Sequence, residues 1–244
     1  MMENEYLEFA KDVAYKAGEI MLKYFKEDNC ASYKYDQTIV TKADTEINHY
    51  LVNRVKEMFP THSVDGEEEQ FGNSNYIWVC DPVDGTAMYA RHIPIAVFSL
   101  ALVVEGNPIV GVVYDPFTDR LYSAIKGKGA YCNNEPIHVN NKSFDNMKTV
   151  GHYDMWSEAE YDIYDVMKEL SKKSYFVSIG SITHASIYVA AGDFIAAIFP
   201  GSKRKHCDLA AAKVIVEEAG GKVTDFFGNE QRYDTDINGA IISN

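Results

Sequence analysis

The chain has 244 residues, of which 46% are hydrophobic and 24% are charged, a composition typical of a globular protein with one large core or two closely joined lobes. Its formal net charge of −13 disfavours binding to nucleic acids or anionic membranes through the bulk of the surface. The longest apolar stretch, residues 96–104, is far shorter than the roughly 20 residues that cross a bilayer, so we expect no membrane span.

The start of the chain and its cysteines indicate the cellular compartment. The N-terminus is acidic and leads directly into a helical pattern, without the basic start and apolar block of a secretion signal. The four cysteines are scattered without a close pair, which predicts neither a zinc site nor a disulfide framework. We therefore expect a cytoplasmic protein with reduced thiols.

The N-terminal part of the chain predicts two amphipathic helices. Apolar residues between Tyr6 and Tyr24 recur at steps of three and four, the spacing of one buried helix face. A second helix is predicted from a capping box at Thr41 and Asp44 to the stop at Pro60. Asp44 therefore has an ordinary interpretation, as an acid that the helix dipole favours in the first turn.

Strands are predicted next, in the middle of the chain. The apolar run at residues 76–80 is followed by strands at 97–104, 109–114 and 120–125, which are separated by short turns. Short turns between consecutive strands predict an antiparallel meander.

After a polar stretch at residues 140–148, strands and helices alternate, which is the pattern of an α/β structure. The predicted elements are helix 158–170, strand 175–178, helix 183–191, strand 194–199, helix 209–219 and strand 222–225. We therefore expect an N-terminal α+β lobe, residues 1–148, and a C-terminal α/β lobe, residues 149–244. No long linker separates them, so the two lobes should form one structural unit.

Acidic residues dominate the candidate functional positions. The hexapeptide Asp81-Pro82-Val83-Asp84-Gly85-Thr86 places two carboxylates three residues apart directly after the strand at 76–80. Alone, this sequence fits an ordinary turn. Further acids change that interpretation, because carboxylates buried together repel one another unless cations neutralise them. These acids are Asp44, the pair Glu67 and Glu68 after Gly66, and Asp208 ahead of the helix at 209–219.

The ordered motifs resemble those of the inositol monophosphatase family of Mg²⁺-dependent, lithium-sensitive phosphatases. The family carries a Gly-Glu-Glu, an Asp-Pro-(Ile/Val)-Asp-Gly-Thr after a tryptophan-bearing strand, and a Trp-Asp-x-Ala-Ala before a helix ending Glu-Ala-Gly-Gly. The resemblance spans nearly the whole chain. It implies an α/β fold, a layered α-β-α-β-α sandwich like that of inositol monophosphatase and fructose-1,6-bisphosphatase, with the active site between the lobes. The matching segments are residues 66–68, 81–86, 208–212 and 218–221.

The resemblance also implies a site with two or three Mg²⁺ ions. Glu67, Asp81 and the backbone carbonyl of Val83 would bind the first metal ion. Asp81, Asp84 and Asp208 would bind the second, and Glu67 would help to hold a weaker third. Hard oxygen ligands of this kind are those that Mg²⁺ prefers.

Catalytic roles follow from the same resemblance. The Thr86 hydroxyl, paired with Asp44, would orient and deprotonate the attacking water, with Glu67 as a further partner. Gly85 and Thr86 would begin a helix whose free N–H groups bind the phosphate. In an unknown fold, Thr86 would instead be interpreted as a plain helix cap.

Departures from the family pattern lie around the expected substrate pocket. Met88 stands where Asn is common, Cys207 replaces the usual Trp, and residues 193–197 lack the acid that binds a ring hydroxyl in inositol-cleaving members. Strict inositol specificity is therefore not expected. The substrate-binding residues that the resemblance implies are Asp84, Ser181, Ile182 and Lys205.

The basic triplet Lys203-Arg204-Lys205 has two interpretations. It is either a solvated loop or, together with Arg91, a site for a second anionic group of the substrate. We expect a Mg²⁺-dependent phosphatase, a homodimer, that acts on small polyol or sugar phosphate monoesters. The alternatives are phosphatases for fructose 1,6-bisphosphate, a 3′-phosphonucleotide or histidinol phosphate, and a catalytically silent metal- or phosphate-binding protein.

Overall fold

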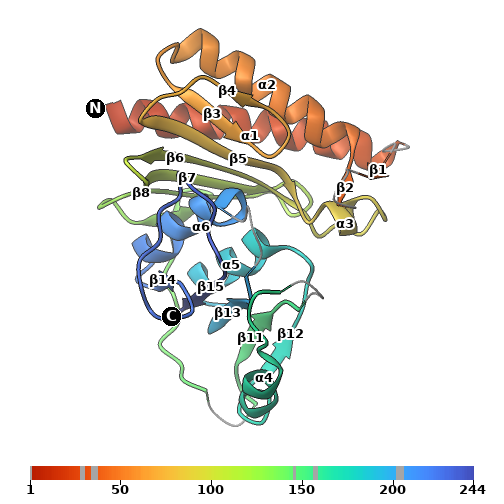
Figure 1. The fold of residues 1–244 in the computed structure, drawn as a ribbon, viewed down its shortest axis with the longest axis vertical. Helices are drawn as coiled ribbons and strands as arrows, with labels where there is room; N and C mark the ends of the chain where they lie inside the picture. The colour runs from red at the N-terminus through yellow and green to blue at the C-terminus, as the bar shows by residue number, and fades with distance from the viewer. Residues whose placement is uncertain (1, 28–30, 34–37, 145–146, 156–158, 202–205) are drawn as a thin grey trace.

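The computed structural model describes residues 2–27, 31–33, 38–144, 147–155, 159–201 and 206–244. Its elements form five layers, which follow one another from top to bottom in Figure 1. Helices α1 and α2 cover one face of an eight-stranded sheet, and α5 and α6 lie between that sheet and a five-stranded one. Helix α4 covers the outer face of the five-stranded sheet. The predicted α-β-α-β-α sandwich is therefore confirmed.

The first layer consists of α1 (Met2–Lys26) and α2 (Lys42–Met58). Both bury the apolar faces that the sequence predicts, and their core cluster includes the fully buried Trp78 of the sheet beneath. The capping box is present, since the Thr41 N–H donates to Asp44 Oδ2 at 2.8 Å. A short two-stranded sheet, β1 (Ser32–Tyr33) and β2 (Ile39–Val40), lies between the two helices in the chain. Among the described residues, no helix combines the length and hydropathy that a membrane span requires.

The large sheet has the order β10-β9-β8-β7-β6-β5-β3-β4. Its strands from β5 to β10 pair antiparallel in sequence order, which confirms the predicted meander. Strand β3 pairs parallel with β5 and antiparallel with β4, and neither β3 nor β4 was predicted. The strands are β3 (Ser63–Gly66), β4 (Gln70–Phe71), β5 (Tyr76–Asp84), β6 (Val97–Val104), β7 (Asn107–Asp115), β8 (Arg120–Ile125), β9 (Ala130–Cys132) and β10 (Glu135–Pro136).

Strand β5 is longer than the sequence predicts, and this changes the setting of two acids. The predicted strand ends at residue 80, but β5 continues through Asp84, which pairs with Val97 of β6. The pairing register shifts between Asp81 and Asp84. Such an irregularity bends a strand and redirects its side chains. The two carboxylates therefore belong to the distorted end of a central strand, and the prediction that they follow the strand was wrong.

The second half of the chain builds a mixed sheet of order β12-β11-β13-β15-β14. Strand β11 is parallel to β12 and β13, whereas the pairings of β15 are antiparallel. The elements are β11 (Val150–Tyr153), α4 (Tyr164–Leu170), β12 (Tyr175–Val177), α5 (Ile182–Ala190), β13 (Ala196–Phe199), α6 (His206–Glu218), β14 (Lys222–Thr224) and β15 (Ala240–Ser243). Strands β11 and β15 were not predicted. Helix α6 begins at His206, so Asp208 lies inside its first turn and not ahead of it, as the sequence had suggested.

Helix α6 is buried between the two sheets, and small residues allow this close packing. It is alanine-rich, and Gly111 of β7 packs directly against it, where a Cβ would approach Ala211 O to 2.7 Å. The proposed lobe boundary at residue 148 falls between β10 and β11, but α5 and α6 share one core cluster with the large sheet. This contact brings residues of α6 to the end of β5.

Candidate metal centre and active site

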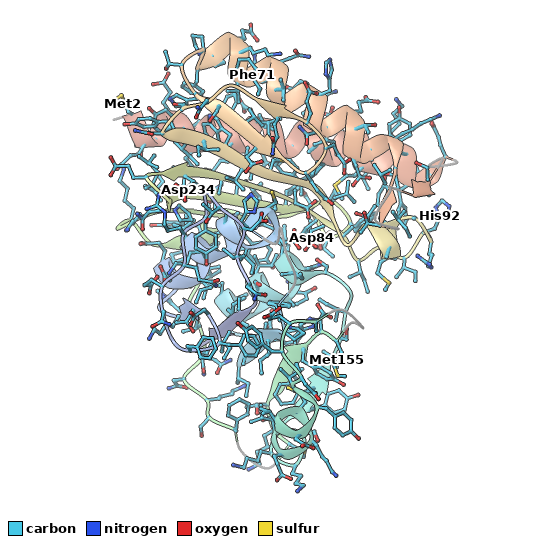
Figure 2. The ribbon with its side chains drawn as sticks, in the orientation of Figure 1. Met2, Phe71, Asp84, His92, Met155 and Asp234 are labelled. Carbon is cyan, nitrogen blue, oxygen red and sulfur yellow. The ribbon has the colours of Figure 1, made fainter. Side chains whose placement is uncertain are left out.

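Three buried carboxylates from distant parts of the chain meet at the end of β5. Asp81 and Asp84 come from that strand, and Asp208 comes from the first turn of α6. One carboxylate oxygen from each residue lies within 4.8 Å of the others. Figure 2 shows Asp84 where the end of β5 faces the helices beneath the large sheet. The packing of α6 against this sheet therefore assembles an acidic cluster that no single segment contains.

The start of α5 holds two members of this cluster. The Ser181 hydroxyl and the Thr183 N–H both donate to Asp84 Oδ2 at 2.6 Å. The Thr183 hydroxyl donates to the backbone carbonyl of Asp208 at 2.5 Å. One turn of helix thus orients the Asp84 carboxylate and fixes the backbone that carries Asp208.

The chemistry of this donor set fits a hard divalent cation. Asp81, Asp84 and Asp208 are between 3% and 6% exposed, so their charges lie in a region of low dielectric constant. Carboxylates this close repel one another, and a divalent cation converts the repulsion into attraction. Mg²⁺ prefers carboxylate and carbonyl oxygens. The three residues can therefore hold a metal ion of this class.

A second pair of residues borders the cluster. The Thr86 hydroxyl lies 2.8 Å from the carbonyl oxygen of Val83, to which it donates, and 3.5 Å from Asp44 Oδ1. Asp44 Oδ2 accepts hydrogen bonds from both the N–H and the hydroxyl of Thr41. The Val83 N–H donates to Asp81 Oδ1 at 3.0 Å. The hydroxyl of Thr86 therefore links the Asp44 carboxylate to the backbone of the hexapeptide.

Burial gives Asp44 unusual acid–base behaviour. Removal from water raises the pKa of Asp44 to about 7, and the negative charges of Glu67 and Glu68 act in the same direction. The hydrogen bonds from Thr41 oppose this rise by favouring the carboxylate. In the absence of metal ions, Asp44 therefore exchanges its proton near neutral pH, the range in which a general base is effective.

Glu67 is not one of the three clustered carboxylates. It follows β3, its side chain is exposed, and its N–H donates to Cys80 O at 3.2 Å. The buried side chain of Asn48 shapes this segment, because its Oδ1 accepts from the N–H groups of Glu68 and Glu69 at 3.0 and 3.2 Å. No sequence motif identifies Asn48 as a support for Glu67. A polar residue on the predicted buried face of α2 nevertheless indicates that its side chain has a hydrogen-bonding role.

The hexapeptide also requires its glycine. Gly85 has a φ of 95°, and a Cβ at this position would lie 2.6 Å from Ile95 O. It precedes the single turn α3 (Thr86–Tyr89), whose Met88 and Tyr89 N–H groups both bond to Gly85 O. The N–H groups at the start of a helix have no acceptor within it.

The other predicted substrate contacts have varied environments. Ser181 is 1% exposed and bonds to Asp84, and Ile182 belongs to the apolar core between the sheets. Ile182 is 6% exposed, so its side chain offers little surface to a substrate. Lys205 and the rest of the basic triplet lie outside the described residues. Met88 contacts the segment before Ser181, since a Cβ at Gly180 would lie 2.7 Å from the Met88 terminal methyl.

Sequence comparison identifies relatives along the whole chain. A family model described as the inositol monophosphatase family matches residues 2–244. Inositol monophosphatase 1 of Solanum lycopersicum is 32% identical over 236 residues, which cover 93% of this chain and 86% of the relative. The fructose-1,6-bisphosphatase/inositol-1-monophosphatase of Aquifex aeolicus is 34% identical over 236 residues, with 91% and 87% covered.

Solved structures show the same fold. The inositol monophosphatase of Thermotoga maritima superposes with a TM-score of 0.88 at 28% identity, covering 98% of this chain and 92% of that one. The extragenic suppressor protein suhB of Bartonella henselae gives a TM-score of 0.89 at 25% identity, with 98% and 94% covered. The family is metal-dependent, in agreement with the acidic cluster. The chain therefore belongs to the inositol monophosphatase family and is a phosphatase that hydrolyses phosphate monoesters.

Proposed function

We propose that the protein is a Mg²⁺-dependent phosphatase for small polyol or sugar phosphate monoesters, and that two or three Mg²⁺ ions bind at the end of β5. The observation that carries this proposal is the convergence of three buried carboxylates beside the Thr86 and Asp44 pair. The ligands would be Glu67, Asp81, the Val83 carbonyl, Asp84 and Asp208.

Hydrolysis of a phosphate monoester is slow because the anionic ester repels nucleophiles and the departing alkoxide is a poor leaving group. When bound, the metal ions supply charge neutralisation and a more acidic water. The chain itself supplies proton acceptors and orientation. The Thr86 hydroxyl would turn its hydrogen from Val83 O, 2.8 Å away, to Asp44 Oδ1, 3.5 Å away, and accept a hydrogen bond from the attacking water, so that the water proton could pass through Thr86 Oγ1 to Asp44.

The phosphate would lie against the start of α3. The N–H groups of Gly85 and Thr86, at the start of this turn, would bind it. Glu67, whose side chain is exposed, would carry the weaker metal ion and could act as a second proton acceptor.

The substrate class is supported by the names of the relatives. The Aquifex aeolicus and Thermotoga maritima relatives are both named fructose-1,6-bisphosphatase/inositol-1-monophosphatase. We propose the same two substrate types for this chain, with 3′-phosphonucleotides and histidinol phosphate as further candidates. A homodimer, lithium sensitivity and a cytoplasmic location are proposed from the family resemblance alone.

The test is phosphate release from a panel of esters, measured with Mg²⁺, with EDTA and with added Li⁺. We expect release with Mg²⁺, its loss in EDTA, its recovery with excess Mg²⁺ and inhibition by Li⁺. The ranking of kcat/KM across the panel identifies the preferred substrate. Asp84→Asn protein purified in parallel controls for contaminating phosphatases.

Two outcomes would contradict the proposal. Release that persists undiminished in EDTA excludes the metal-dependent mechanism. Metal binding without release from any ester favours the catalytically silent alternative.

A further inference from the structure

We propose that His206 is a positioning residue that ties the Asp208 end of α6 to the strand leading to Glu67, and so sets the spacing of the metal centre. This inference rests on the proposed function, because it assumes that Glu67 and Asp208 are both metal ligands. His206 is the first residue of α6, and it is only 7% exposed.

The imidazole of His206 joins three segments of the chain. Its Nε2 lies 2.9 Å from Asp65 Oδ2 of β3, and its Nδ1 lies 3.7 Å from Asp236 Oδ1 in the segment before β15. An ionised carboxylate only accepts hydrogen bonds, so Nε2 carries the hydrogen and donates to Asp65. A bond to a charged acceptor at this distance is among the stronger hydrogen bonds in proteins.

The acceptor is itself held in place. Asp65 Oδ1 accepts a hydrogen bond from the Gln70 side chain at 2.7 Å, which fixes the carboxylate from its other oxygen. The Cys207 thiol lies 3.8 Å from the backbone carbonyl of Asp65, so a second residue of α6 contacts the same point. Burial raises the pKa of that thiol, which is therefore a neutral packing group. The start of α6 thus rests on a defined position of β3.

The position of this contact in the chain gives it functional meaning. His206 lies two residues before Asp208, and Asp65 lies two residues before Glu67. The contact therefore joins the two backbone segments that supply Glu67 and Asp208. Mg²⁺ tolerates little departure from octahedral geometry, so a change in this spacing weakens binding. Loss of a group that orients metal ligands typically costs about 10- to 100-fold in affinity or activity.

The alternative is that the contact only stabilises the packing of α6. The chain offers a matched control at the other end of the same helix. The Glu218 carboxylate accepts hydrogen bonds from the N–H groups of Gly127 at 2.6 Å and Gly129 at 2.7 Å, in the turn that follows β8. It joins α6 to the same sheet far from the acidic cluster. Loss of this contact should affect stability but not metal binding.

The experiment compares His206→Asn, His206→Gln and Glu218→Ala with the wild type. The Gln amide reaches the position of His Nε2, whereas the shorter Asn amide does not, so only Gln preserves the bond to Asp65. Mg²⁺ binding is measured by calorimetry, the melting temperature is measured in EDTA, and kcat is measured at saturating Mg²⁺. Calorimetry separates metal affinity from catalysis.

We expect His206→Asn to weaken Mg²⁺ binding about tenfold or more and His206→Gln to restore it to within about threefold of the wild type. Glu218→Ala should lower the melting temperature and leave Mg²⁺ affinity unchanged. The inference is overturned if His206→Asn and Glu218→Ala both lower the melting temperature while binding Mg²⁺ as the wild type does. A wild-type protein that neither binds Mg²⁺ nor releases phosphate would instead overturn the proposed function itself.

Discussion

Asp208→Asn is expected to reduce kcat about 10³-fold or more, because metal ions supply several kcal/mol of transition-state stabilisation in such reactions. The substitution removes one of the three clustered charges and preserves the size of the side chain in the first turn of α6. Phosphate release at saturating substrate and Mg²⁺ measures the effect. The control is Asp225→Asn, a half-buried residue in the turn after β14, whose carboxylate accepts hydrogen bonds from Phe227 and Asn229.

The same variant should lose its response to metal. A ligand at 100 times its dissociation constant stabilises a protein by about 2.7 kcal/mol, so Mg²⁺ should raise the melting temperature of the wild type. In Asp208→Asn this rise should be absent or much smaller, while circular dichroism shows the same fold. Full activity in the variant, or an equal rise in melting temperature, would remove Asp208 from the metal centre.

Asp44→Asn is expected to lower kcat by about 10²- to 10⁴-fold, the usual contribution of a general base. The amide can still accept the hydrogen bonds from Thr41, so the capping box of α2 is retained. It cannot take the proton that the Thr86 hydroxyl would pass on. The acid limb of the pH–rate profile should therefore be lost together with most of the rate.

Although Asp44→Asn should lower kcat, it should raise the stability of the metal-free protein. Burial raises the pKa of Asp44 to about 7 from the ordinary value of 3.8. Between these two values the folded protein holds a proton that the unfolded chain has released, so the free energy of unfolding falls as pH rises. Above about pH 7, where Asp44 is ionised in the folded protein too, this loss of stability is complete. In EDTA, the free energy of unfolding of Asp44→Asn should thus depend less on pH over this range than that of the wild type. At pH 8 the variant should be more stable than the wild type.

Urea unfolding at a series of pH values in EDTA measures this difference. Bound Mg²⁺ should flatten the wild-type curve, because nearby cations favour the charged carboxylate. Parallel curves for the two proteins would mean that Asp44 is not a buried group with a raised pKa. A variant that keeps wild-type kcat would exclude Asp44 as the proton acceptor.

The fold was predictable where neighbouring residues carry the sequence pattern that defines an element. The period of α1 and the capping box at Thr41 are carried by adjacent residues, and so are the short turns of the meander. Strands β3, β11 and β15 were missed because each has four residues and is defined by its partners in the sheet. Helix α6 starts earlier than predicted, at His206, because burial between two sheets outweighs local start signals.

In the candidate site too, the contiguous motif was predictable from the sequence and its long-range contacts were not. The hexapeptide from Asp81 to Thr86 is contiguous, so its acids could be singled out from the sequence. The partners of those acids could not, because they depend on how α5 and α6 pack against the sheet. Ser181 and Thr183 reach Asp84 across almost a hundred residues of chain, and His206 reaches Asp65 across an even longer interval. Such contacts follow from the tertiary arrangement and leave no spacing motif.

The central claim is that carboxylates from β5 and α6 bind divalent cations in one site. A crystal grown with Mn²⁺ in place of Mg²⁺ and measured at the manganese absorption edge tests it directly, since anomalous scattering locates the metal without assumptions about activity. We predict at least two peaks, with one between Asp84 and Asp208 and one on the Glu67 side of Asp81. Well-ordered Asp81, Asp84 and Asp208 side chains with no anomalous peak among them would contradict the account.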